Sequence, residues 1–198
     1  GVILDTDEYL YKAFSNARSY FKLKKITKSQ FKREFEKNPK YIFKCEKLLL
    51  KLPFSIRVIS EIKRNAGNIK LTPGIEELIK DCFSDFVLFV CSHNIGFIIG
   101  KVLKSYGLET YFKTIFSTGF LYKKREVLKR ISQHYSRMDV LFITDTPSDV
   151  KEAKIIGIKT VAVSFGIALT KDLKKAKPDK IVRNIKELRK YIFEFKNT

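Results

Sequence analysis

The chain has 198 residues, of which 44% are hydrophobic and 31% are charged, and Phe alone occurs 17 times. This composition excludes an intrinsically disordered chain, because enough apolar side chains are present to form a buried core. Forty Lys and Arg against 21 Asp and Glu give a formal net charge of +19, and the length excludes a large multidomain architecture.

Neither the apolar segments nor the cysteines indicate a membrane or secreted protein. The longest apolar runs, 86–91 and 95–99, are far shorter than the roughly 20 residues that a membrane-spanning helix requires. The first residues lack the basic and long apolar segments of a signal peptide. The three cysteines, Cys45, Cys82 and Cys91, are widely separated and lack the close Cys/His pairs of a zinc site. We therefore expect a cytoplasmic protein with reduced thiols and no membrane partner.

The first third of the chain combines one short strand with a long helical block. The run Val2-Ile3-Leu4 is typical of a buried strand. From about residue 11 to residue 70, apolar side chains recur every three or four positions among lysines, which predicts helices and no strand. Helix starts within this block are indicated by Thr27, Pro39 and Pro53.

After Thr72-Pro73-Gly74, apolar runs typical of strands alternate with segments of helical spacing. The predicted strands cover residues 86–91, 114–116, 140–143, 160–163 and 180–182. The predicted helices cover residues 75–82, 95–106, a segment from about 125, 150–156 and 185–195. This alternation favours an α/β fold with a doubly wound parallel sheet. We expect residues 1–11 and 72–198 to form this core, and residues 12–71 to form an inserted helical domain over the carboxyl edge of the sheet, where such folds bind ligands.

Polar residues follow four of the predicted strands. They are Asp5 with Asp7, Ser92 with His93 and Asn94, Lys123 with Lys124, and Asp145 with Asp149. The carboxyl ends of parallel strands meet at one edge of a sheet, and two carboxylates joined by a third from a neighbouring strand suit Mg²⁺. A lysine and a hydroxyl group nearby would hold an anion. Together these groups indicate a phosphate pocket in which a carboxylate can attack phosphorus.

With these motifs the sequence resembles the haloacid dehalogenase-like hydrolases, close to the phosphoglycolate phosphatase branch. The four motifs of that superfamily are matched, in order, by residues 2–7, 90–94, 124–128 and 144–149. The resemblance spans nearly the whole chain. It implies a Rossmann-like core with a small inserted helical cap, in agreement with the α/β prediction.

The resemblance also implies a role for each carboxylate. Asp5 is the implied nucleophile and a metal ligand, and Asp7 is the implied general acid and base, whose backbone carbonyl also contacts the metal. Asp145 is a further implied metal ligand, with Asp149 as its support. The implied cofactor is Mg²⁺.

The remaining motif residues are implied to bind the phosphoryl group. Ser92 matches the hydroxyl residue of the second motif, and His93 follows it. Lys124 fits best as the lysine that opens a helix in the third motif, with Lys123 as the alternative. Ser92 and Lys124 are therefore catalytic candidates, and His93 is a further candidate for substrate binding.

The implied activity is that of a Mg²⁺-dependent phosphatase, a phosphoric monoester hydrolase, acting on a small phosphorylated metabolite through an aspartyl phosphate. Two positions depart from the family pattern: Glu8-Tyr9 replaces Gly-Thr after the second aspartate, and Thr144 replaces Gly before Asp145. The first departure leaves open a catalytically weak or silent member that binds nucleic acid or an acidic partner. A nucleic-acid partner is possible but not favoured, because the lysines are spread over nearly every predicted helix, which is more typical of a solvated lysine-rich surface.

Overall fold

The protein is described here by a computed structural model covering residues 1–37, 39–92, 96–117 and 124–196, and it divides into two compact units. The α/β unit comprises Gly1–Ile3 and Leu71–Thr198, and the helical unit comprises Leu4–Lys70. The helical unit takes in the segment just after Ile3 because the first helix packs among the other helices of that unit.

The strands of the α/β unit pair in parallel, as the alternation of strands and helices predicts. Strand β3 (Leu88–Ser92) pairs with β4 (Phe112–Ser117), and the order of the second group is β5 (Leu141–Thr144), β6 (Lys159–Val163), β7 (Lys180–Val182). Ser92 at the end of β3 lies opposite Ser117, and Thr144 at the end of β5 lies opposite Ala162. The expected α/β class is confirmed.

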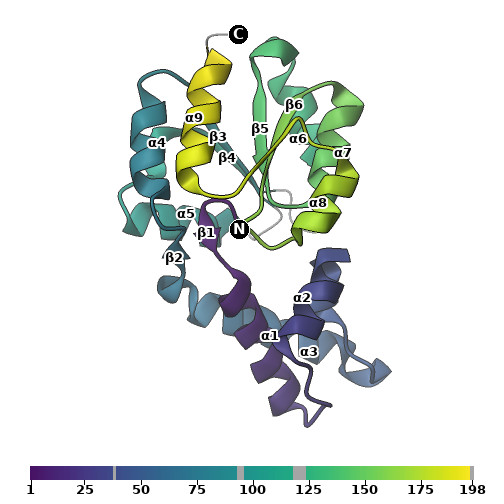
Figure 1. Ribbon diagram of the computed structural model, residues 1–198. Helices are drawn as coiled ribbons and strands as arrows, with labels where there is room; N and C mark the ends of the chain where they lie inside the picture. The colour runs from purple at the N-terminus through teal and green to yellow at the C-terminus, as the bar shows by residue number, and fades with distance from the viewer. Residues whose placement is uncertain (38, 93–95, 118–123, 197–198) are drawn as a thin grey trace. The chain divides into compact units, whose positions relative to one another are not determined.

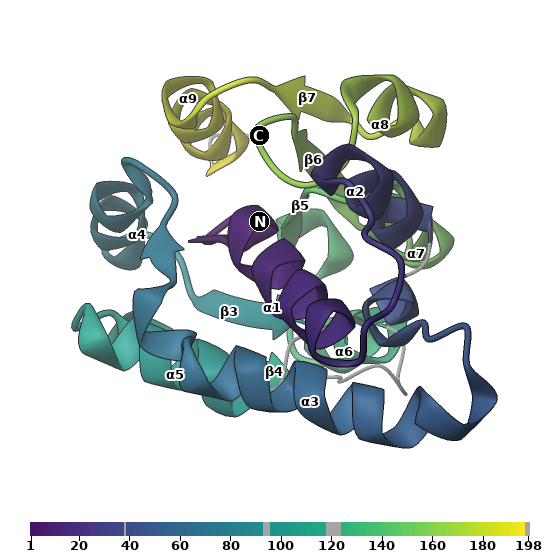
Figure 2. The same ribbon diagram turned by 90° about the horizontal axis from the view of Figure 1, so that it is seen from below.

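The helices of the α/β unit cover these strands (Figures 1 and 2). They are α4 (Ile75–Phe83), α5 (Gly96–Ser105), α6 (Lys124–Ile131), α7 (Pro147–Ile156), α8 (Thr170–Ala176) and α9 (Ile185–Lys196), with single turns η4 (Glu109–Tyr111) and η5 (Arg137–Asp139). Helix α5 contacts β4, α6 contacts β3, and α7 contacts β5 and β6. Parallel strands need such crossover connections, so each helix follows from the topology.

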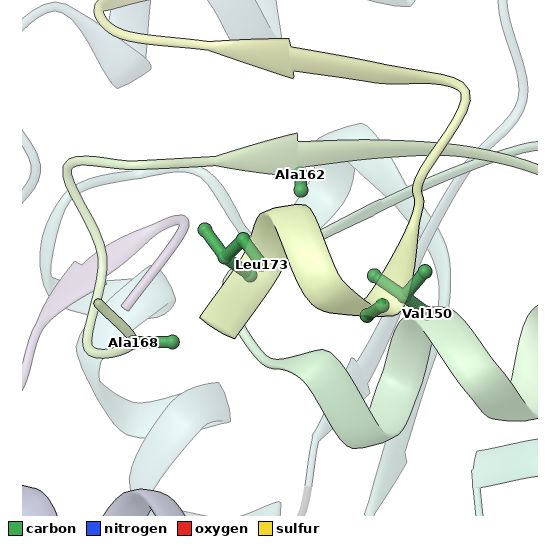
Figure 3. Close-up of a cluster of buried hydrophobic side chains, with 5 residues drawn as sticks. Val150, Ala162, Ala168 and Leu173 are labelled. Atoms are coloured by element: carbon green, nitrogen blue, oxygen red, sulfur yellow. The ribbon is translucent and has the colours of Figure 1, made fainter. Parts of the chain in front are cut away.

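Helix α7 is fixed on two sides by buried apolar side chains. Val150 packs in a cluster with Leu173 of α8 and with alanines of β6, α8 and the loop between them (Figure 3). Ala153 and Ile156 pack in a second cluster with Leu128 of α6. Because both clusters hold α7, the loop that precedes it is held at the end of β5.

Helix α8 was not expected from the sequence. Its segment is a run of lysines, which hides the two side chains that pack inward, Leu173 and Ala176. Glycines close two other segments as expected, since Gly107 and Gly157 have φ angles of +67° and +76°, which suit a residue without a Cβ atom.

The helical unit contains α1 (Asp7–Tyr20), α2 (Lys28–Lys37) and α3 (Lys51–Arg64), with single turns η1 (Pro39–Phe43), η2 (Leu48–Leu50) and η3 (Ala66–Asn68). Helix α1 packs along α3 (Figures 1 and 2). The fully buried ring of Phe14 lies 4.9 Å from that of Phe31 and 5.9 Å from that of Phe54, measured between centroids. None of the described helices is both long and apolar enough to cross a membrane.

Thr27 caps α2 as predicted. Its Oγ1 accepts a hydrogen bond from the Gln30 backbone N–H at 3.2 Å, and its own N–H donates to Gln30 Oε1 at 3.0 Å, which is a capping box. The other two predicted starts differ slightly: Pro39 begins the single turn η1, and α3 begins two residues before Pro53.

The sequence predicts that the first strand belongs to the parallel sheet, but the structure pairs it elsewhere. Strand β1 (Leu4–Asp5) pairs with β2 (Lys70–Leu71), a strand that the helical pattern of residues 11–70 did not indicate. The physical reason is that the chain segments before and after the helices run side by side, as the hydrogen bond from Thr72 N–H to the Ile3 carbonyl at 2.9 Å also shows.

Candidate functional site

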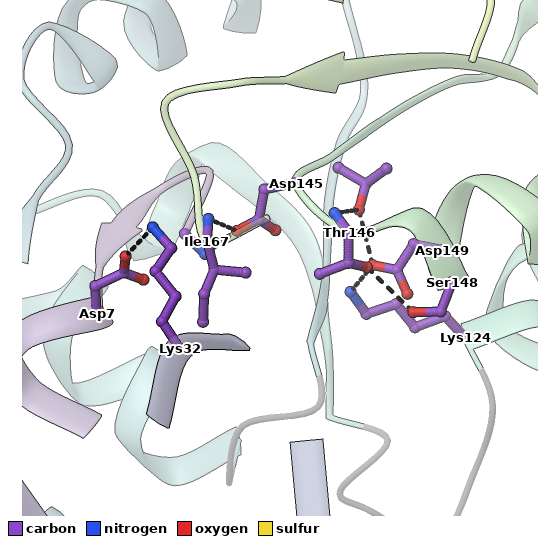
Figure 4. A network of polar contacts seen from close by, with 10 residues as sticks. Asp7, Lys32, Lys124, Asp145, Thr146, Ser148, Asp149 and Ile167 are labelled. Atoms are coloured by element: carbon purple, nitrogen blue, oxygen red, sulfur yellow. Dashed lines mark hydrogen bonds and ion pairs between the residues drawn. The ribbon is translucent and has the colours of Figure 1, made fainter. Parts of the chain in front are cut away.

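One strand end and two helix starts of the α/β unit bring a lysine, a threonine and an aspartate together. Lys124 is the first residue of α6, Thr144 is the last residue of β5, and Asp149 lies in the first turn of α7. Lys124 Nζ donates to Asp149 Oδ2 at 2.5 Å, and Thr144 Oγ1 donates to the same oxygen at 2.8 Å (Figure 4). The Asp149 residue is only 2% exposed, so its charge needs these donors.

The local sequence explains why Asp149 points at this group. Thr146 is the N-cap of α7 and Pro147 follows at the first helical position, where its missing N–H costs nothing. The backbone N–H of Thr146 donates to Thr144 Oγ1 at 3.3 Å. Asp149 therefore sits in the first helical turn, where the helix dipole favours a negative charge.

The charge of Lys124 is stabilised by its partner. Burial would lower the pKa of this lysine, but the Asp149 carboxylate outweighs burial and holds the pKa above its ordinary value. Its Nζ also lies 5.9 Å from the centroid of the Phe142 ring. A lysine has three N–H donors, and Asp149 uses one of them, so the ammonium can bind a further anion.

Asp145 is the second buried carboxylate of this loop. Its Oδ2 accepts a hydrogen bond from the Ile167 N–H at 3.0 Å (Figure 4). Burial raises the pKa of Asp145, whereas the Ile167 N–H and the positive charge of Lys124 act to lower it. Asp145 is therefore a buried carboxylate that a backbone N–H holds in place.

The end of β3 belongs to the same region. Cys91 interacts electrostatically with Lys124 and Asp149, and α6 contacts β3. Burial is the main cause that raises the pKa of the Cys91 thiol to about 11, and Lys124 opposes it. Ser92 follows Cys91 as the last residue of the strand. His93 and Lys123, which the motifs also single out, lie outside the described residues.

Asp5 and Asp7 belong to the helical unit and not to the α/β unit that contains Asp145. Asp5 ends β1 and is exposed, whereas Asp7 is the first residue of α1. The Asp7 carboxylate accepts from Lys32 Nζ at 2.9 Å (Figure 4). Both aspartates also favour the charged form of Lys28, although its main partner is Glu8. Their predicted roles as nucleophile and acid–base stay predictions.

The pair Glu8-Tyr9, which departs from the family motif, lies inside α1. Glu8 is exposed and pairs with Lys28 Nζ at 2.5 Å. The Tyr9 hydroxyl donates to the Ile62 carbonyl of α3, and burial raises the pKa of that hydroxyl to about 12. Both side chains thus hold α1 against α2 and α3, where a Gly-Thr pair could make neither contact.

The donors around Asp145 do not complete a metal site. In the part of the chain that the structure describes, no three His, Cys, Asp or Glu side chains form a group that could hold a metal ion. Asp145 has the right chemistry for one Mg²⁺ ligand, whereas Asp149 is occupied by Lys124 and Thr144. The arrangement is instead suited to placing one buried cation, Lys124, beside a strand end.

Two parts of the site were not expected from the sequence. The Ile167 N–H donates to Asp145, and Gly166 lies so close that a Cβ atom there would be 2.2 Å from Asp145 Cβ. The sequence feature that could have indicated them is Gly166, three residues after β6. A glycine after a strand is typical of a place where the backbone approaches another group closely. Thr144 was recognised only as a replacement for glycine, not as a donor.

The comparisons with known proteins agree with this fold. The family model of haloacid dehalogenase-like hydrolases matches residues 1–163. A haloacid dehalogenase-like family protein from Streptococcus pneumoniae is 17% identical, with a TM-score of 0.80, over 97% of this chain and 94% of that one. A predicted phosphatase from Clostridium acetobutylicum is 20% identical, with a TM-score of 0.80 and the same shares covered.

A third structure, a predicted phosphoglycolate phosphatase from Haemophilus somnus, is 15% identical, with a TM-score of 0.82, over 96% of this chain and 93% of that one. No curated protein matches the chain. At these identities the structures show a shared fold, whereas the family model covers most of the sequence. The chain belongs to the haloacid dehalogenase-like hydrolase family.

Proposed function

We propose that this protein is a phosphatase that hydrolyses a small phosphorylated metabolite. The observation that carries the proposal is the buried Lys124–Asp149–Thr144 group close in the chain to the buried Asp145, in a haloacid dehalogenase-like chain. Two similar structures bear the names of a predicted phosphatase and a predicted phosphoglycolate phosphatase, which supports the same class of substrate.

Lys124 supplies the charge that phosphoryl transfer requires. In that reaction negative charge spreads over the phosphoryl oxygens, and catalysis comes mainly from positioning and electrostatic stabilisation. Asp149 and Thr144 fix the lysine before substrate arrives, so little reorganisation is needed. Ser92 ends the strand next to this region, and its hydroxyl is the proposed second contact to the phosphoryl group.

The nucleophile and the metal are separate parts of the proposal. We assign the attack on phosphorus to Asp5 and the proton transfers to Asp7, on the family motif alone. Magnesium dependence rests on the family as well, with Asp145 as the proposed ligand and Asp149 as its support. Because the described carboxylates do not form a complete metal site, each of these assignments needs its own test.

The experiment measures phosphate release from p-nitrophenyl phosphate and from a panel of metabolite phosphates, with Mg²⁺ and then with EDTA. We expect metal-dependent turnover in the wild type and none in Lys124→Met. Absence of turnover across the whole panel would reject the phosphatase and favour a silent family member that uses the site for binding.

The nucleophile is tested in the same assay with Asp5→Asn. Loss of turnover in this variant, with retained folding by circular dichroism, supports Asp5. Turnover within about tenfold of the wild type would reject Asp5 as the nucleophile but leave the phosphatase proposal in place. Asp85→Asn is the matched control, because Asp85 is a partly exposed aspartate that pairs with Lys196 instead.

A further inference from the structure

Four aliphatic side chains of the helical unit protrude into solvent together. We call them the leucine patch: Leu48 and Leu49 of η2, and Leu52 and Ile56 of α3. Their exposed fractions range from 59% for Ile56 to 91% for Leu49. Scattered apolar side chains are common on protein surfaces, but four strongly exposed aliphatic side chains within nine residues are a local concentration that favours an interaction site.

The patch lies on the outer side of α3. Leu52 and Ile56 are four residues apart in α3 and so share one face of this helix, and Leu48 and Leu49 lie in the turn η2 just before it. The opposite face of α3 is already packed, since Phe54 and Val58 are fully buried and the Phe54 ring contacts Phe14 of α1. The leucine patch therefore does not belong to the face of α3 that packs in the core of the helical unit.

The charges around the patch are positive. Lys44, Lys47 and Lys51 flank the leucines and are exposed. Glu46 is the only acid in residues 44–57, and its carboxylate is paired with buried Arg18 at 3.0 Å. The helical unit as a whole carries 17 Lys and Arg against 7 Asp and Glu, a net charge of +10.

These positive charges indicate which kind of partner binds the leucine patch. A second copy of this chain would set lysines against lysines, which opposes self-association. Binding hot spots between proteins are rich in Trp, Tyr and Arg and poor in Leu, whereas the patch is wholly aliphatic and protruding. Protruding leucines flanked by lysines match an amphipathic segment that lies in the interface of an anionic bilayer.

We propose that the leucine patch docks this protein on anionic lipid surfaces. The leucines enter the boundary between headgroups and acyl chains, and the three lysines contact the anionic headgroups. This is peripheral contact by an exposed helix face, not a spanning helix. It adds a membrane partner that the length of the apolar runs did not indicate.

The test is co-sedimentation with vesicles of phosphatidylcholine and phosphatidylserine at a ratio of about 7 to 3, compared with pure phosphatidylcholine. We expect binding to the anionic vesicles only, and weaker binding as salt is raised, because surface charges are screened. Substitution of Leu49→Ser and Leu52→Ser should each weaken binding by about tenfold, since each leucine loses its apolar contact with lipid.

Two control pairs match the variants. Met138→Ser and Ile155→Ser remove apolar side chains of the α/β unit that are 78% and 65% exposed, and should leave binding unchanged. Lys47→Glu with Lys51→Glu should reduce the preference for anionic vesicles, whereas Lys171→Glu with Lys174→Glu, exposed in α8, should reduce it much less. Circular dichroism confirms that each variant is folded, which is expected because all these side chains are exposed.

Three results would overturn the proposal. The first is no sedimentation with anionic vesicles. The second is binding that the patch variants and the control variants weaken equally, which would indicate only a general effect of the +19 charge. The third is a concentration-dependent dimer in sedimentation velocity that the Leu49→Ser variant abolishes, which would assign the patch to a second copy of the chain.

Discussion

Lys124 Nζ lies 2.5 Å from Asp149 Oδ2, and both side chains are shielded from water, with exposed fractions of 12% and 3%. A buried ion pair is not by itself strong evidence of stability, because both charges lose their hydration. Removal of one partner is costly, however, since the other charge then stays buried without compensation. The pair thus couples the start of α6 to the first turn of α7.

We predict that Lys124→Met lowers the free energy of unfolding by about 3 kcal/mol, because Asp149 keeps the Thr144 hydroxyl but loses the cation that compensates its buried charge. The double variant Lys124→Met/Asp149→Leu should cost less than the sum of the two single variants. Urea unfolding followed by circular dichroism measures each value. Lys129→Met is the control, because this lysine of α6 is exposed and its pair with Glu126 spans 3.6 Å, so a change above about 0.5 kcal/mol is not expected. Strictly additive losses in the double variant would show that the pair is not coupled.

Glu61 is a buried acid of the helical unit. Its pKa allows us to predict how the free energy of unfolding depends on pH. Its carboxylate accepts hydrogen bonds from Arg64 at 2.7 Å and Asn16 at 3.2 Å, and it forms an ion pair with Arg57 at 2.8 Å. Burial would raise the pKa of Glu61, but these three partners together lower it below its ordinary value. A depressed carboxylate pKa stabilises the fold above the unfolded pKa of about 4.3, and this stability is lost as pH falls through the folded pKa.

We therefore expect the free energy of unfolding to fall below about pH 4.5, and Glu61→Gln to flatten that part of the curve. At pH 7 the same variant should cost about 1 to 3 kcal/mol, since it replaces charge-assisted hydrogen bonds by neutral ones. Urea unfolding over a pH series tests both points. Glu194→Gln serves for comparison, as Glu194 is 59% exposed and pairs with Lys190 at 3.8 Å. An equal acid response in the Glu61→Gln variant and the wild type would contradict this account.

The sequence predicts regular elements well and the partners of polar groups poorly. The strand at residues 180–182 and the ends of helices at Gly107 and Gly157 follow from local patterns, which need no distant residue. Helix α8 was missed because lysines mask its two inward residues. The Lys124–Asp149 pair joins residues 25 positions apart, so motif order indicates both members but not their contact.

Dependence on a distant partner also explains why the pairing of the strand in the first motif was predicted wrongly. The aspartates at positions 5 and 7 follow an apolar run as the family pattern requires, but whether that run joins the parallel sheet depends on its pairing partner. The partner in the structure is β2, a two-residue strand without a distinctive sequence signal. Likewise, Glu8 and Tyr9 show their helix contacts only once α2 and α3 are placed beside α1.

The Cys91 thiol should react slowly in the native protein. Its pKa is raised to about 11, chiefly by burial, so only a small fraction is thiolate near neutral pH. We expect iodoacetamide to modify Cys91 much more slowly at pH 8 than in the urea-unfolded chain, with the rate rising about tenfold per pH unit up to pH 10. Lys124→Met should slow the reaction further, because Lys124 opposes the effect of burial. Peptide mass spectrometry measures the rate at this cysteine, and a pH-independent rate would contradict the prediction.

Gly166 is required by the position of Asp145. A Cβ atom at residue 166 would lie 2.2 Å from Asp145 Cβ and 2.7 Å from Asp145 Oδ2, closer than any real contact, so Asp145 or the backbone must move in Gly166→Ala. Such overpacking should lower stability by about 1 to 3 kcal/mol. If Asp145 acts in phosphate hydrolysis, the same shift should lower turnover by about tenfold or more, because small displacements of catalytic groups are costly.

Gly100→Ala is the matched substitution for this test. Gly100 lies within α5 and a Cβ atom there meets nothing within 4 Å, so alanine should raise stability by about 1 kcal/mol through its higher helix propensity and leave turnover unchanged. Thermal unfolding and phosphate release are measured on both variants. A Gly166→Ala protein with lowered stability but wild-type turnover would separate Asp145 from the reaction, because the carboxylate would have been displaced without effect on phosphate release.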